Sequence, residues 1–160
     1  ASDVYKRQVM SKTAEEVAAK LQEPMTRLRV LYDRIASHYS LTPAQMTIME
    51  FLYKNGASRI SAVSEAEGIR MPTASNALVQ LERRELIRRV RDSVDRRGVK
   101  VALTNLGKTE YEEAREARRK TLAQLLDTLD EDSLATALEL ADVIVELAER
   151  YTPAKHNELH

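Results

Sequence analysis

The sequence contains no cysteine and no tryptophan, one phenylalanine, and only four glycines and four prolines in 160 residues. Without cysteine the chain can form neither disulfides nor a thiol-based redox sensor. No apolar segment approaches the roughly 20 residues of a membrane-spanning helix, and we find no secretory leader, so we expect a cytoplasmic protein without membrane contact. The scarcity of helix-breaking residues, together with 43% hydrophobic content, favours a mainly helical domain with a substantial core.

The formal net charge is zero, but the charges are segregated along the chain. Residues 83–100 contain eight Arg or Lys and three acidic residues, whereas residues 105–150 contain twelve acidic and six basic residues. A local basic segment attracts phosphate whatever the net charge of the whole protein. The segregation therefore favours a nucleic-acid-binding segment before residue 105, with a solvated charged loop as the alternative.

The two ends of the chain predict helices that pack on a partner. Residues 1–9 do not resemble the rest, and we expect them to be a non-native leader. From Thr13, apolar residues recur with helical spacing over about 25 residues, and Pro24 predicts a kink or a break. A last helix is expected after Asp130, with apolar residues about every 3.5 positions, as in paired helices. We expect the polar tail 152–160 to be mobile.

Between the ends, the sequence predicts three further helices before residue 85. Thr42, Pro43 and Gln45 are typical of a capped helix start, and Gly56 is expected to end that helix in a left-handed conformation. Ser61 is expected to start a short helix, which Gly68 ends.

The next helix begins at Pro72 and has two distinct faces. Its apolar face is Ala74, Leu78 and Leu81, and its polar face is Thr73, Asn76, Gln80, Arg83 and Arg84. A short helix, a glycine turn and a second helix with small polar residues near its start are typical of a helix-turn-helix, which reads DNA in the major groove. An ordinary amphipathic surface helix is the alternative.

A basic hairpin follows this helix. Residues 86–91 predict a strand, and residues 99–104 alternate between apolar and polar side chains as a second strand does. The loop between them carries Arg96 and Arg97 at its expected tip, where an arginine can enter the negative minor groove. Asp95 is placed to pair with and orient such an arginine, and a simple salt bridge within the turn is the alternative.

The order of these elements and several motifs resemble the MarR family of bacterial transcriptional regulators over residues 17–150. The matching motifs are Leu41-Thr42-Pro43-Ala44-Gln45, Pro72-Thr73, Leu81-Glu82, and Asp95-Arg96-Arg97 followed by Leu103-Thr104 and Gly107. The resemblance implies a mainly α fold with a small β-wing. A winged helix-turn-helix region at 41–104 would then lie between dimerisation helices at 10–40 and 105–151. It further implies a homodimer that binds a pseudo-palindromic operator in double-stranded DNA and acts as a repressor.

The same resemblance assigns roles to individual residues. Thr73 and Asn76 fall where the family reads bases, and Arg97 would be the minor-groove arginine with Asp95 as its intramolecular partner. Many members carry arginine at the position of Asn76, which leaves the operator sequence open. We expect the DNA contacts to come from Arg70, Thr73, Ser75, Asn76, Gln80, Arg91, Asp95, Arg96 and Arg97.

The resemblance also implies that a small phenolic or aromatic ligand could release the protein from DNA. The residues nearest the expected pocket are His38, Tyr39, Met46 and Met49, for which ordinary packing is the alternative. His38 is the sole histidine before the tail, and His156 and His160 follow Pro153, so we expect neither a metal site nor a cofactor.

Two other classes of function compete with a DNA-binding regulator. A winged-helix protein-interaction module without DNA binding is compatible with the zero net charge and the acidic C-terminal half. An enzyme would need a nucleophile–base pair, a glycine-rich phosphate loop or a metal-ligand cluster, and the sequence offers none of these. We therefore predict a non-enzymatic, DNA-binding transcriptional regulator.

Overall fold

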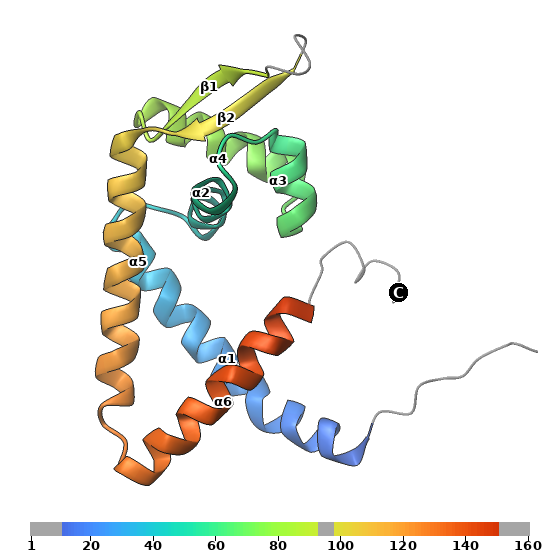
Figure 1. Ribbon diagram of the computed structural model, residues 1–160, viewed down its shortest axis with the longest axis vertical. Helices are drawn as coiled ribbons and strands as arrows, with labels where there is room; N and C mark the ends of the chain where they lie inside the picture. Colours follow the sequence, from blue (N-terminus) through green and yellow to red (C-terminus); the bar gives the residue numbers. More distant parts are fainter. Residues whose placement is uncertain (1–10, 93–97, 151–160) are drawn as a thin grey trace, which may run out of the picture. The chain divides into compact units, whose positions relative to one another are not determined.

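The computed structural model of the protein describes residues 11–92 and 98–150, which divide into two compact units at Arg34 and Ile35. The elements are α1 (Lys12–His38), α2 (Pro43–Asn55), α3 (Ile60–Glu67), α4 (Met71–Arg83), β1 (Ile87–Arg91), β2 (Val99–Leu103), α5 (Asn105–Leu126) and α6 (Glu131–Arg150) (Figure 1). The two strands pair antiparallel. These elements confirm the predicted mainly α fold with a small β-wing.

Helix α1 runs without a break through Pro24. The predicted break at this residue is therefore wrong. Proline removes one backbone donor and crowds the preceding turn, but strong helix formers such as Ala, Glu, Leu and Lys surround it and favour continuing the helix. Several apolar side chains of α1 are exposed, among them Val17 and Met25.

Helix α2 is the centre of the second unit, where it packs against α3, α4, α5 and β2 (Figure 1). Its start has the predicted capping box, in which Thr42 and Gln45 exchange side-chain and backbone hydrogen bonds. Gly56 follows with the predicted positive φ of 72°, but its ψ of −156° lies outside the left-handed helical region. The core around α2 is formed by Leu41, Met46, Ile48, Met49, Leu52, Val63, Ala74, Ala77, Leu78, Leu81, Leu86, Ile87, Val101, Leu103, Tyr111 and Ala114.

The pair α3 and α4 forms the helix-turn-helix. Gly68, with φ 64° and ψ 23°, adopts the left-handed conformation that ends α3, as predicted. Helix α3 begins at Ile60 rather than at Ser61, because the carbonyl of Arg59 already accepts the N–H of Val63 at 3.1 Å. The apolar face of α4 is buried as predicted, and Ala77 joins it.

The wing is a short antiparallel pair in which Ile87 lies opposite Leu103. It is also attached to the segment before α3. The N–H of Ser58 donates to the carbonyl of Val101 at 3.0 Å, and the N–H of Val101 donates back at 2.9 Å. This bridge joins the second strand directly to the start of the helix-turn-helix.

Helix α5 leaves the wing at a tightly packed corner. The hydroxyl of Thr104 accepts the N–H of Gly107 at 2.9 Å and so caps the helix, as predicted. Gly107 is buried, and a Cβ there would lie 1.9 Å from the carbonyl oxygen of Leu86. The close approach expected of this glycine is thereby confirmed.

Helix α6 begins after Asp130, whose Oδ1 accepts the N–H of Ser133 at 2.8 Å, as the predicted cap requires. Helix α5 ends at Leu126, short of its expected end near residue 129, because Thr128 and Leu129 donate to carbonyls only three residues back. None of the residues of α6 is buried. Among the residues that the structure describes, no helix is both long and apolar enough to cross a bilayer.

Candidate nucleic-acid interface

Helix α4 presents a polar face away from the core. Thr73, Ser75, Asn76 and Gln80 are exposed, whereas Ala74, Ala77, Leu78 and Leu81 are buried. The spacing of three and four residues places Thr73, Asn76 and Gln80 on one side of the helix. Helix α4 therefore has the division of faces that a DNA-reading helix needs.

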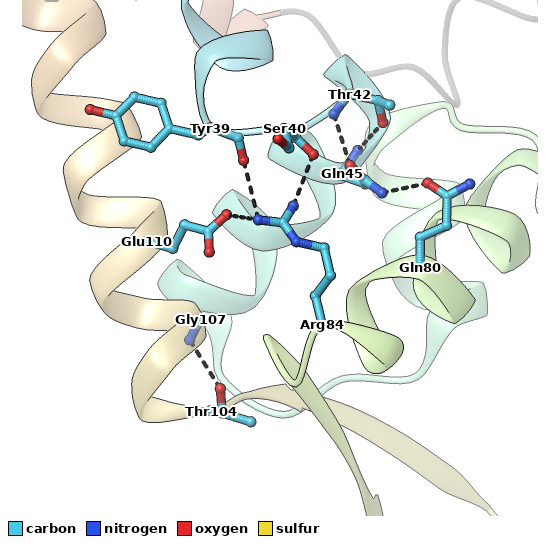
Figure 2. A network of polar contacts seen from close by, with 9 residues as sticks. All are labelled: Tyr39, Ser40, Thr42, Gln45, Gln80, Arg84, Thr104, Gly107 and Glu110. Atoms are coloured by element: carbon cyan, nitrogen blue, oxygen red, sulfur yellow. Dashed lines mark hydrogen bonds and ion pairs between the residues drawn. The ribbon is translucent and has the colours of Figure 1, made fainter.

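The polar face of α4 is connected to α2 through a buried glutamine. Gln45, which is 2% exposed, accepts the N–H of Thr42 at 2.8 Å and donates from Nε2 to Oε1 of Gln80 at 2.8 Å (Figure 2). The amide oxygen of Gln80 is thus occupied by the protein. Its amide nitrogen can still donate, so Gln80 suits an acceptor such as a phosphate oxygen or a base acceptor.

The end of α4 is fixed by Arg84, which does not belong to the exposed polar face. Its guanidinium donates to the carbonyl oxygens of Ser40 at 2.8 Å and Tyr39 at 3.2 Å, and it pairs with the carboxylate of Glu110 (Figure 2). The expectation that Arg84 lies beside Arg83 on the polar face is wrong. Arg84 follows the last helical residue and turns toward three orphan oxygen atoms of the segment before α2 and of α5.

Several arginines around α4 and β1 are available for phosphate. Arg70, Arg83, Arg88 and Arg91 are exposed and have no ion-pair partner among residues 11–92 and 98–150. Arg89, by contrast, is paired with Glu82 at 3.0 Å. Helix α4 also begins at Arg70 without a side-chain cap, which leaves N–H groups at its positive end free to bind an anion.

The wing begins at a second charged cluster. Asp92 is buried at the end of β1 and is paired with Arg59 and Lys100. The predicted tip residues Asp95, Arg96 and Arg97 lie outside the described residues. Their roles remain predictions.

The four predicted ligand residues divide between surface and core. His38 is exposed, and Tyr39 is half-buried. Met46 and Met49 are 3% and 0% exposed and pack within the core around α2. The structure therefore brings the two methionines together as core residues, with Tyr39 packed against that core.

Sequence reasoning missed the roles of Gln45, Arg59 and Arg84 in supporting this surface. The capping box identified Gln45 as a helix-start residue, but its second bond is to Gln80, 35 positions away. Arg59 and Arg84 bind partners 33 and 44 positions away, and no local pattern signals such pairs. Among the described residues, no cluster of three or more His, Cys, Asp or Glu could hold a metal ion.

The comparison with protein families matches residues 41–99 to the model described as the MarR family. The chain is 33% identical over 128 residues to the uncharacterized HTH-type transcriptional regulator YwaE of Bacillus subtilis, covering 78% of this chain and 75% of that protein. It is 26% identical over 153 residues to the HTH-type transcriptional repressor MdtR of the same organism, covering 91% and 96% of the two chains.

Solved structures share the fold. A MarR family protein from Bacillus stearothermophilus superposes with a TM-score of 0.74 at 22% identity, covering 89% of this chain and all of the other. NadR, solved in complex with 4-hydroxyphenylacetate, superposes with a TM-score of 0.63 at 25% identity, covering 84% of this chain and 94% of its own.

Proposed function

This chain belongs to the MarR family of winged helix-turn-helix, DNA-binding transcriptional regulators, and we propose that it acts as a homodimeric repressor of a pseudo-palindromic operator. Regulators of this family are not enzymes. The observation that carries the proposal is the division of α4 into a buried apolar face and an exposed face of small polar side chains. Repression is supported by the similarity to MdtR, which is itself named a repressor.

Sequence reading is assigned to α4. The amide of Asn76 can bond adenine through two hydrogen bonds, and Thr73 can contact a base edge or a thymine methyl. Ser75 and Gln80 add polar groups, and Arg70 lies at the uncapped start of the helix, where phosphate is favoured. Arg91 at the end of β1, with Asp95, Arg96 and Arg97 beyond it, completes the proposed DNA-contacting set.

Dimerisation is supported by the apolar side chains of α6. Leu138, Val143, Val145 and Leu147 are 73%, 58%, 56% and 65% exposed. An apolar patch of this kind on a regulator favours a protein interface. A second copy is the natural partner, because one recognition helix contacts too few bases to specify a site alone.

Ligand control is a further part of the proposal. The solved complex of NadR with 4-hydroxyphenylacetate, at 25% identity, supports a small phenolic or aromatic acid as the effector. His38 and Tyr39 would meet such a ligand first, since Met46 and Met49 are packed in the core. Addition of 4-hydroxyphenylacetate should lower the affinity of the protein for its operator, and unchanged affinity would exclude this acid as the effector.

Selection of bound duplexes from a random DNA pool tests the proposal. A dimer should enrich an inverted repeat whose half-sites are about one helical turn apart. Light scattering of the complex should give two chains for each duplex. Enrichment of an unrepeated site, or a folded monomer at micromolar concentration, would contradict the dimeric mode. Failure to enrich any sequence would favour a protein-interaction role instead.

A further inference from the structure

A buried carboxylate lies at the root of the wing, where β1 ends. Asp92 is 5% exposed, and its Oδ2 accepts hydrogen bonds from Nε of Arg59 at 3.0 Å and from Nη2 at 2.8 Å. The Nζ of Lys100 lies 3.3 Å from Oδ1 of the same carboxylate. Because a buried carboxylate is tolerated only when it is paired, Asp92 holds both cations in place.

Gly98 completes this root. The N–H of Asp92 donates to the carbonyl of Gly98 at 3.1 Å, so these two residues close the base of the segment between them. A Cβ at Gly98 would lie 2.6 Å from Nη2 of Arg59. The φ of Gly98 is not positive. The glycine is therefore explained by the space that the guanidinium of Arg59 occupies, and not by backbone conformation.

Arg59 connects the root of the wing to the helix-turn-helix. It is the residue that precedes α3, and its neighbour Ser58 pairs with Val101 of β2. The guanidinium of Arg59 makes two hydrogen bonds to one carboxylate, which fixes the direction of the side chain as well as its distance. The position of the wing is thereby tied to the start of α3.

We infer that Arg59 and Asp92 are positioning residues, which hold the wing in the orientation that meets DNA without contacting DNA themselves. The inference rests on the proposed function, since it requires that the wing and α4 bind one duplex together. It also removes Arg59 and Lys100 from the set of phosphate-binding cations, although both lie in or beside the basic segment. Their charge is directed to Asp92.

Charge alone predicts the opposite result, and this makes the inference testable. Replacing Asp92 by Asn removes a negative charge from a basic region, which by electrostatics alone tightens DNA binding. If Asp92 positions the wing through Arg59, the same substitution weakens binding. Asp127→Asn, at the exposed C-terminal end of α5, makes the same change of charge away from the wing and is the matched control.

The experiment measures fluorescence anisotropy of the full chain on a duplex selected from a random pool, over a series of salt concentrations. Asp92→Asn should bind at least about tenfold more weakly than Asp127→Asn. The slope of log affinity against log salt should stay at the wild-type value, whereas loss of one phosphate contact lowers it by about one. Binding by Asp92→Asn as tight as that of Asp127→Asn would overturn the inference. If the wild-type chain bound no DNA, the proposed function would fail instead.

Gly98→Ala tests the same contact without any change of charge. The added Cβ displaces the flexible end of Arg59 and should leave the melting temperature nearly unchanged, so this variant decides the matter even where Asp92→Asn fails to fold. Gly98→Ala should weaken DNA binding in the wild-type chain and have no effect in a chain that already carries Arg59→Ala. An equal loss in both backgrounds would show that Gly98 acts independently of Arg59 and would overturn the inference.

Discussion

The side-chain amide of Gln45 donates from Nε2 to Oε1 of Gln80 at 2.8 Å, which joins the start of α2 to the polar face of α4. The direction of this bond follows from chemistry. The N–H of Thr42 is only a donor, so the atom of Gln45 that meets it at 2.8 Å is the amide oxygen. The NH₂ group of Gln45 then faces Gln80, whose nearer atom must be its oxygen.

Replacing Gln45 by Ala should lower the free energy of unfolding by about 2 kcal/mol, because it removes the cap of α2 and leaves the N–H of Thr42 without its partner. Chemical denaturation measures the loss. Gln124→Ala, an exposed position on α5, is the control and should change stability by less than about 0.5 kcal/mol. Equal stability of the two variants would contradict the role of Gln45.

Adjacent arginines at the end of α4 should differ sharply in their effect on stability. Arg84→Ala removes hydrogen bonds to two backbone carbonyls and an ion pair with Glu110, and should cost about 2 kcal/mol. Arg83→Ala changes an exposed side chain and should be nearly neutral in stability. Thermal unfolding distinguishes them, and a larger loss for Arg83→Ala would refute the assignment of Arg84.

Gly107→Ala should destabilise the corner between the wing and α5. In an ordinary helix this substitution is favourable by roughly 1 kcal/mol. Here the new Cβ would meet the carbonyl oxygen of Leu86, a backbone atom that cannot move aside alone, and the net loss should be about 3 kcal/mol. Denaturant unfolding gives the sign, and a stabilised variant would show that the corner has room for a methyl group.

The cap of α6 should make stability depend on acid pH. Hydrogen bonding from Ser133 to the carboxylate lowers the pKa of Asp130 below its ordinary value. Because the pKa is lower in the folded state, the stabilisation is complete above the unfolded pKa and is lost as the pH falls through the folded one, in the range below about 4. Asp130→Asn retains an oxygen acceptor but should lose this pH dependence. A ¹³C NMR titration of the Asp130 carboxyl with an unshifted midpoint would contradict the expectation.

The parts of the fold that follow from nearby residues could be predicted from the sequence. The cap formed by Thr42 and Gln45 is a pattern within four residues, and the alternation around Val101 and Leu103 identifies a half-buried strand. Gly68 and Gly107 were identified by the turn and the close approach that they permit. Each of these signals depends on covalent neighbours, which constrain one another whatever the tertiary structure.

The supports of the candidate interface could not be predicted in this way. Arg84 looks like one more cation on a polar helix face until the chain brings the carbonyl of Ser40 to it from 44 positions away. Asp92 looks like a loop acid until burial forces it to pair with Arg59. Pro24 misled for a related reason, since a single lost hydrogen bond does not end a helix whose other residues all favour it. Long-range pairing and burial decide these residues, and neither is visible in a local pattern.

The central claim is that α4 reads DNA sequence through the exposed face that contains Asn76, and one substitution tests it most directly. Fluorescence anisotropy of Asn76→Ala should be compared on the selected operator and on a scrambled duplex, with Asn105→Ala at the exposed start of α5 as the control. We predict that Asn76→Ala loses about tenfold to hundredfold of its preference for the operator, since a bidentate base contact contributes about 1–3 kcal/mol of discrimination. Its binding to the scrambled duplex and its salt dependence should not change, because Asn76 carries no charge to pair with phosphate. An undiminished preference for the operator would contradict the account.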